Sequence, residues 1–103
     1  RMLMFEDIVM LDDRSVQQVL REVDGADLAL ALKGVPEGAV RSKITGNLSE
    51  RAAENLLEEV ELLGPVRLTQ VEEARQNIIR TISRLEEQGQ IMVRRGNDDE
   101  FVD

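Results

Sequence analysis

Apolar residues recur every three or four positions along most of this 103-residue chain, a spacing typical of amphipathic helices. One such face lies between residues 49 and 63, at Ala53, Leu56, Leu57, Val60 and Leu63. A longer one follows at Val71, Ala74, Ile78, Ile82 and Leu85. No segment alternates apolar and polar residues for long enough to build a sheet. The pattern therefore predicts an all-α fold, a compact orthogonal bundle of about six short helices.

Local signals place the first three helices. A short helix is expected to start near Glu6, and Asp12 and Asp13 are capping residues suited to open a second. Asp24 should cap a third helix that ends at Gly34. Residues 28–32 of this third helix are apolar all round, which predicts a central, buried element.

The remaining three helices have equally local signals. Pro36 suits the first turn of a fourth helix, whose inward residues would be Val40, Ile44 and Leu48. Ser49 is a good N-cap for a fifth helix, and Gly64 with Pro65 should end it. A capping box at residues 69–72 (TQVE) is expected to open the sixth, which Gly89 should end.

The polar side of the fifth helix is unusual. At about 100° per residue, Arg51, Asn55, Glu58 and Leu62 lie opposite its apolar face, with Glu54 and Glu59 beside them. No Lys or Arg stands three or four positions from Glu58 or Glu59. Glu54, Glu58 and Glu61 instead repel one another, by roughly 0.2–0.5 kcal/mol for each close pair. The simple interpretation is a solvated outer face, but the pattern as a whole favours a surface made for a partner.

Composition excludes several classes of function. The chain has no Cys and no His, so disulfides, the usual zinc ligand and the commonest general base are absent. Glu58 and Glu59 point about 100° apart and cannot converge on one reacting group. A net charge of −8 argues against nucleic acid and anionic lipid. No apolar run approaches the roughly 18 residues of a membrane span. We therefore expect a binding or mechanical role, with no catalytic residue, cofactor, metal site or membrane insertion.

Several motifs, in order and spacing, resemble the C-terminal domain of the FliG family of bacterial flagellar motor switch proteins. They are MFEDIVMLDDRSVQQVLREV, DLALALKG, NLSERAAENL, GPVRLTQVEEA and RLEEQGQI. The similarity covers Met2 to about Val93. Its most specific pieces are ALKG (residues 31–34), SERAAE (49–54) and GPVRL (64–68).

This resemblance implies a rotor function. The family's C-terminal domain is helical and meets the membrane stator, whose MotA-type subunit moves a cytoplasmic loop against charged FliG residues to generate torque. The domain belongs to the switch complex that controls rotation direction, with FliM and other FliG copies as neighbours, at the cytoplasmic face of the inner membrane. The family's stator-binding charges correspond here to Lys33, Arg51, Glu58, Glu59 and Arg67.

The sequence departs from the family pattern in two features. The acidic pair is Glu-Glu where relatives often have Asp, which keeps the charge and lengthens the reach. The family's M-F-x-F hinge motif reads Met2-Leu3-Met4-Phe5 here, so Phe5 matches and Leu3 does not. The resemblance divides the chain into a hinge segment (1–5), a helical domain (6–93) and an acidic flexible tail (94–103). It also implies a fragment of a larger protein, without the family's amino-terminal parts.

Each assigned residue also has a simpler interpretation. Lys33 can interact with the C-terminal dipole of its own helix, Arg51 can pair with Glu54, and Arg67 can help close the loop before the sixth helix. Residues 2–5 can be ordinary core. The alternative function is a scaffold domain, outside the motor, that holds a partner helix in an apolar groove. Salt separates the two hypotheses, because charged contacts weaken at high salt and apolar contacts do not.

Overall fold

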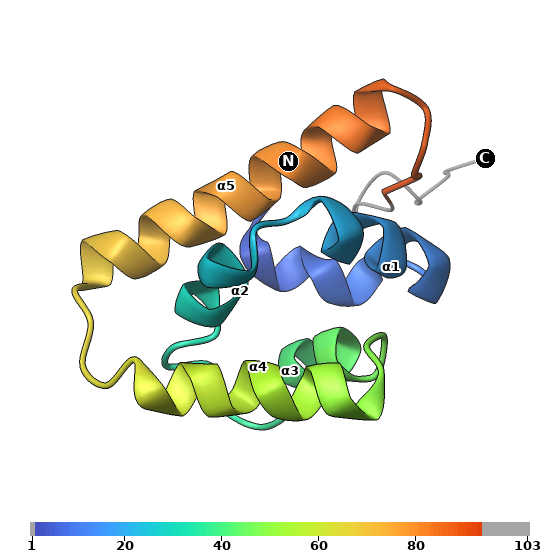
Figure 1. The fold of residues 1–103 in the computed structure, drawn as a ribbon. Coiled ribbons are helices and arrows are strands. Elements are labelled where there is room, and N and C mark those ends of the chain that lie inside the picture. Colours follow the sequence, from blue (N-terminus) through green and yellow to red (C-terminus); the bar gives the residue numbers. More distant parts are fainter. Residues whose placement is uncertain (1, 94–103) are drawn as a thin grey trace.

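Residues 2–93 are described by a computed structural model of the chain, and within this range six helices and no strand occur. They are a 3-10 helix, η1 (Phe5–Met10), followed by α1 (Asp13–Glu22), α2 (Gly25–Ala31), α3 (Ala39–Thr45), α4 (Glu50–Leu62) and α5 (Leu68–Glu87). The predicted all-α fold is confirmed (Figure 1). The predicted acidic tail, residues 94–103, lies outside the described residues.

Helices α2 and α5 form the centre of the fold. The five apolar positions predicted for α5 are all buried: Val71, Ala74, Ile78, Ile82 and Leu85. Helix α2 packs between α5 and α4, as Figure 1 shows. Leu28, Ala29 and Ala31 are buried within it, and the prediction of a central element is confirmed. No helix in residues 2–93 is long and apolar enough to cross a membrane.

The predicted caps are confirmed at three helix starts. The side chains of Asp12, Asp24 and Ser49 accept backbone N–H groups of the first turns of α1, α2 and α4, at 2.8, 2.8 and 3.1 Å. Each satisfies a donor that the helix itself cannot pair. Because these contacts span only two or three residues, the sequence alone identified them.

The fourth helix was placed wrongly at its start. Helix α3 begins at Ala39, and Pro36 lies in the loop before it. Gly38 has φ +151°, a backbone conformation that cannot belong to a right-handed helix and that L side chains rarely adopt. Ile44 is buried as predicted, but Val40 is only half-buried, and so is Leu48, which lies beyond the end of the helix.

The capping box of the last helix was also placed wrongly. Helix α5 begins at Leu68, and Thr69 lies inside its first turn. The N-cap is Arg67, whose backbone N–H donates to the side-chain oxygen of Gln70 at 3.1 Å. The chain leaves the loop in an extended conformation that ends at Arg67. The capping contact is therefore made two residues earlier than predicted, by Gln70 with Arg67 and not by Glu72 with Thr69.

The segment before η1 alternates between buried and exposed side chains. Leu3 and Phe5 are 8% and 3% exposed, whereas Met2 and Met4 are 82% and 52% exposed. The Met4 N–H donates to the buried Asp7 carboxylate at 2.8 Å, which fixes the start of η1. In this structure half of the segment therefore belongs to the core.

A polar network joins α1 to α3. Asp13 accepts hydrogen bonds from Lys43 and Asn47, and its carboxylate lies 3.3 Å from the Lys43 ammonium. Gln17 donates to Asn47 at 3.0 Å. The hydrogen bonds from Asn47 and Lys43, with the charge of Lys43, lower the pKa of Asp13 below its usual 3.8. The hydrogen bonds from Ser15 similarly lower the pKa of Asp12.

Candidate functional site

Helix α4 is buried on one side only. Leu56 and Val60 are buried against the core, while Ala53 and Leu57 are half-buried. Leu63, predicted on the same face, lies after the last turn and is 36% exposed. The outer face of α4 is defined here as six of the exposed residues of the helix: Arg51, Glu54, Asn55, Glu58, Glu59 and Leu62.

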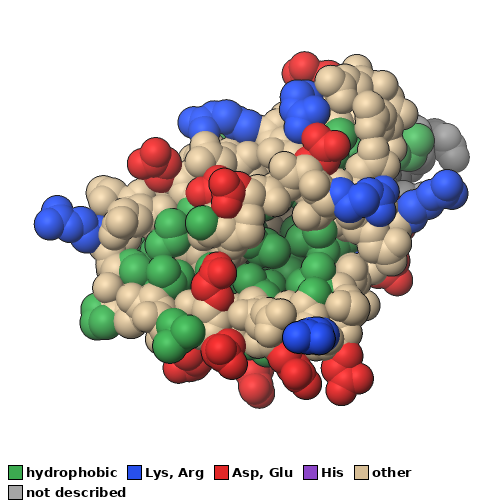
Figure 2. All heavy atoms as spheres, viewed as in Figure 1, with side chains coloured by type: hydrophobic (Ala, Val, Ile, Leu, Met, Phe, Trp, Pro, Cys, Tyr) green, Lys and Arg blue, Asp and Glu red, His purple; other side chains and the backbone are tan. Residues whose placement is uncertain are grey.

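The charges of this outer face have no internal partners. In residues 2–93, the side chains of Arg51, Glu58 and Glu59 take part in no ion pair or hydrogen bond. Arg51 and Glu54 do not pair, so the simpler interpretation of Arg51 is wrong for this structure. Figure 2 shows acidic side chains in a row along the edge formed by α4, with a basic one beside them. This edge therefore presents free charges to solvent.

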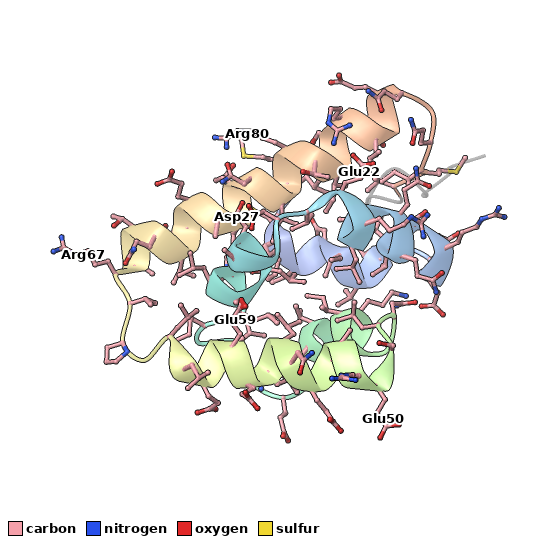
Figure 3. All side chains as sticks on the ribbon, in the orientation of Figure 1. Glu22, Asp27, Glu50, Glu59, Arg67 and Arg80 are labelled. Atoms are coloured by element: carbon pink, nitrogen blue, oxygen red, sulfur yellow. The ribbon has the colours of Figure 1, made fainter. Side chains whose placement is uncertain are left out.

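The two adjacent carboxylates do not point in one direction. In Figure 3, Glu59 lies on the side of α4 that is drawn toward α2, whereas Glu50 at the start of the helix points away from the body. Glu58 precedes Glu59 by one residue and is therefore turned by about 100°. The pair covers two sides of the helix, which suits contact with a broad partner more than with a small ligand.

Lys33 touches the C-terminal end of α4. Its ammonium donates to the Val60 carbonyl at 3.2 Å, and the residue is half-buried. The Gly64 N–H bonds to Glu61, at 3.2 Å, with Gly64 in the left-handed conformation (φ +61°). This leaves the Val60 carbonyl for Lys33, one of the terminal carbonyls that lack a helical partner. The Lys33 ammonium thus interacts with the C-terminal end of α4, a contact that the simpler interpretation, an interaction with the dipole of its own helix, did not include.

Arg67 stands apart from the other charges. Its backbone opens α5, and its side chain is exposed and points away from the body (Figure 3). Among the described residues its guanidinium has no hydrogen bond or ion pair. The loop before α5 is therefore held by the Arg67 backbone and Gln70, while the charge itself is free.

The structure thus groups the five assigned charges unequally. Arg51, Glu58 and Glu59 share α4, Lys33 contacts the end of that helix, and Arg67 begins the next one. A pocket of about 440 Å³ lies near Lys33 and Arg67. It is lined by Lys33, Gly34, Val66, Leu68, Val71 and Arg75. We call it the Leu68 pocket. No group of three acidic side chains that could hold a metal occurs in residues 2–93.

Sequence reasoning missed Arg75, which lines the Leu68 pocket. Its guanidinium bonds to the backbone carbonyls of Ala31 and Lys33, at 2.9 and 3.1 Å. The signal was present but weak: Arg75 follows the buried Ala74 directly and so lies at the edge of the apolar face of α5. Its partners are more than 40 positions away in the sequence, and periodicity cannot identify them.

Comparison with known proteins places these features in a family. The sequence model described as the FliG C-terminal domain matches residues 1–93. The chain is 57% identical, over 102 residues, to the flagellar motor switch protein FliG of Thermotoga maritima. The alignment covers 99% of this chain and 30% of that protein. It is 53% identical to FliG of Borreliella burgdorferi, covering 99% of this chain and 29% of the relative.

Solved structures agree with the sequence relatives. A crystal structure of a FliG segment from H. pylori superposes with a TM-score of 0.86 at 39% identity, covering 90% of this chain and 40% of that one. Full-length FliG from Aquifex aeolicus gives a TM-score of 0.80 at 39% identity, over 85% of this chain and 27% of that one. The chain spans about a third or less of the length of the curated relatives named above. It belongs to the FliG C-terminal domain family.

Proposed function

We propose that this chain is a rotor domain of a bacterial flagellar motor, which receives torque through the charges of α4. The observation that carries the proposal is the outer face of α4. Arg51, Glu58 and Glu59 are exposed and unpaired within residues 2–93, on a helix whose other side is in the core. The partner is the cytoplasmic loop of a MotA-type stator subunit, and Lys33 and Arg67 complete the charge set.

Weak charged contacts suit this task. Exposed ion pairs contribute roughly 0.2–1 kcal/mol each, so a stator loop can bind and leave repeatedly. Charges of both signs on one face also favour one orientation of the encounter over others. Lys33 would act differently from the rest, because its ammonium already donates to Val60. It has two further donors for a stator carboxylate.

The setting of the domain follows from the same proposal. The domain would lie in the switch complex on the cytoplasmic face of the inner membrane, next to FliM and other FliG copies, and would take part in setting rotation direction. Residues 2–5 would be the hinge to a preceding domain. Because Leu3 and Phe5 are buried on the body, hinge motion would first have to release them.

Amide hydrogen exchange tests the hinge. If residues 2–5 move, the Met4 N–H, which donates to the Asp7 carboxylate, and the Asp7 N–H, which donates to the Met4 carbonyl, should exchange faster than the helical amides of α5, such as that of Ile78. Exchange of the Met4 and Asp7 amides at the slow rate of Ile78 would contradict the hinge.

Charge reversal tests the stator contact. Glu58→Lys with Glu59→Lys, in the full-length motor protein, should impair swimming while the domain keeps its melting temperature, since neither residue contacts the core. A matched control is Glu37→Lys with Glu73→Lys, which changes the total charge equally at two exposed residues outside α4, one in the loop before α3 and one on α5. Reversal of a complementary charge on the stator loop should restore part of the rotation. Equal impairment by the control, or no rescue by any stator reversal, would contradict the mechanism.

The alternative function, a scaffold domain that holds a partner helix, is favoured by one observation. Leu62 and Leu68 are 79% and 71% exposed, and Leu68 lines an open pocket beside Val66 and Val71. An apolar ridge of a partner helix would fill such a site.

Two variants separate the alternatives. Leu68→Ser should weaken partner binding more than Arg51→Glu does if the apolar pocket is the site, and Arg51→Glu should weaken it more if the charged face is the site. Binding of the wild-type chain to the isolated stator loop, measured at low and at high salt, gives a second criterion. Binding at low salt that is lost at high salt supports the charged face. Absence of binding to the stator loop at both salt concentrations supports the scaffold alternative.

A further inference from the structure

Arg75 lies where three parts of the chain meet. It belongs to α5, its guanidinium carbon is 5.3 Å from the centre of the Phe5 ring, and its nitrogens reach the C-terminal end of α2. It also lines both the Leu68 pocket and a smaller hollow of about 160 Å³ on the Phe5 side. The side chain therefore borders two hollows and contacts the elements around them.

The contacts of Arg75 use the specific shape of a guanidinium. Its Nε donates to the Ala31 carbonyl at 2.9 Å, and one Nη donates to the Lys33 carbonyl at 3.1 Å. A planar guanidinium can stack on an aromatic face and still present its edge donors. Lysine has a single ammonium with no plane, and it could not hold two carbonyls while stacked on Phe5.

The bond from Arg75 to the Lys33 carbonyl fixes the backbone position of Lys33. Helix α2 has only seven residues, and so short a helix is marginal without outside contacts. The Lys33 N–H donates to Leu30 at 3.1 Å, and its carbonyl accepts from Arg75. Both backbone groups of Lys33 are thereby held, which limits where its side chain can reach.

We propose that Arg75 is a positioning residue that holds Lys33 against the C-terminal end of α4. The path is continuous: Phe5 supports the Arg75 guanidinium, Arg75 holds the Lys33 backbone, and the Lys33 ammonium holds the Val60 carbonyl. Arg75 thus sets the place of one proposed stator-binding charge and ties it to α4. The functional importance of that place rests on the proposed function, whereas the contact path itself does not.

The path can be tested without a stator, by NMR on the 103-residue chain. Lys33→Met removes the bond to Val60, so it should shift the amide signal of Glu61, which shares a peptide group with the Val60 carbonyl. In an Arg75→Met background the Lys33 backbone is no longer held. There, Lys33→Met should shift the amide signal of Glu61 by about half as much as in the wild type, or less. The matched control background is Arg80→Met, because Arg80 is an exposed residue of the same helix that donates to the Asn77 side chain. There the Glu61 shift should be unchanged.

Two further variants keep the test decisive. Phe5→Leu removes the ring beneath the guanidinium and leaves the donors, so it should reduce the Lys33 effect less than Arg75→Met does. Arg75→Lys should not restore the effect of Lys33→Met on the Glu61 amide signal, because a positive charge alone cannot hold the Lys33 carbonyl in place. A Glu61 shift of equal size in the wild-type and Arg75→Met backgrounds would overturn the proposal, as would full restoration by Arg75→Lys. Either result would leave the stator proposal standing, since charge-reversal rescue tests that separately.

Discussion

Helices α4 and α5 carry similar apolar spacing but hold the fold to different degrees. Helix α5 contacts η1, α1 and α2, and buries five side chains. Helix α4 packs chiefly on α2 and buries two. The period of an amphipathic pattern shows that one face is covered, but not by how many neighbours. The difference separates a helix that stabilises the domain from one whose outer face is free for a partner.

The largest expected effect is loss of a buried side chain from α5. Ile82→Ala should lower the free energy of unfolding by about 2–5 kcal/mol, because Ile82 is 1% exposed and the cavity would be enclosed. Leu62→Ala on α4 is the matched control and should change it by less than about 0.5 kcal/mol. Urea denaturation measures both, and equal losses would remove the distinction between the helices.

An intermediate effect is expected at the helix starts. Ser49→Ala should cost about 1 kcal/mol, because the Ser49 hydroxyl accepts the Ala52 N–H at 3.1 Å. Thr69→Ala should cost nothing, since Thr69 lies inside the first turn of α5 and is not its N-cap. Thermal unfolding of the two variants checks this. A larger loss of stability in Thr69→Ala than in Ser49→Ala would support the capping box predicted from the sequence.

A smaller effect is expected from the outer face of α4. Glu58→Lys with Glu59→Lys should leave the free energy of unfolding within about 0.5 kcal/mol of wild type. A slight increase is the expected direction, because the change removes repulsion with Glu54 and Glu61. Calorimetry at low salt gives the comparison, and a marked loss of stability would show that this face contributes to the fold.

The last prediction concerns the contact between α1 and α3, outside both helices, where the free energy of unfolding should depend on pH. The lowered pKa of Asp13 means that its charged form stabilises the folded state above pH 3.8. This contribution is lost as the pH falls through the lowered value. Asp13→Asn should therefore be less stable than wild type at pH 6, and the gap should narrow toward about pH 2.5. Unfolding by urea at both pH values tests the sign. A gap that widens in acid would contradict it.

What could be predicted from the sequence was mostly local. The buried side of α5 and the caps Asp12, Asp24 and Ser49 depend on residues a few positions apart, and all were identified correctly. The start of α5 was wrong, because it depends on how the chain leaves the loop before Arg67. The bond from Lys33 to Val60 could not be predicted, since it joins residues 27 positions apart through tertiary packing. The stator-binding residues came from family resemblance, and their contact with a stator stays a prediction.

The one-sided burial of α4 has a consequence for how such a surface can evolve. An exposed side chain with no partner in the domain is little constrained by folding, so its charge can reverse without loss of the domain. Under the proposed function, the constraint on Arg51, Glu58 and Glu59 would come from the partner that binds them. Sign changes at these positions should accompany opposite changes in the partner, whereas the inward residues Leu56 and Val60 should vary only among apolar residues of similar volume. Under the proposed function, folding and partner binding would therefore act as two independent selective pressures on neighbouring positions of one helix.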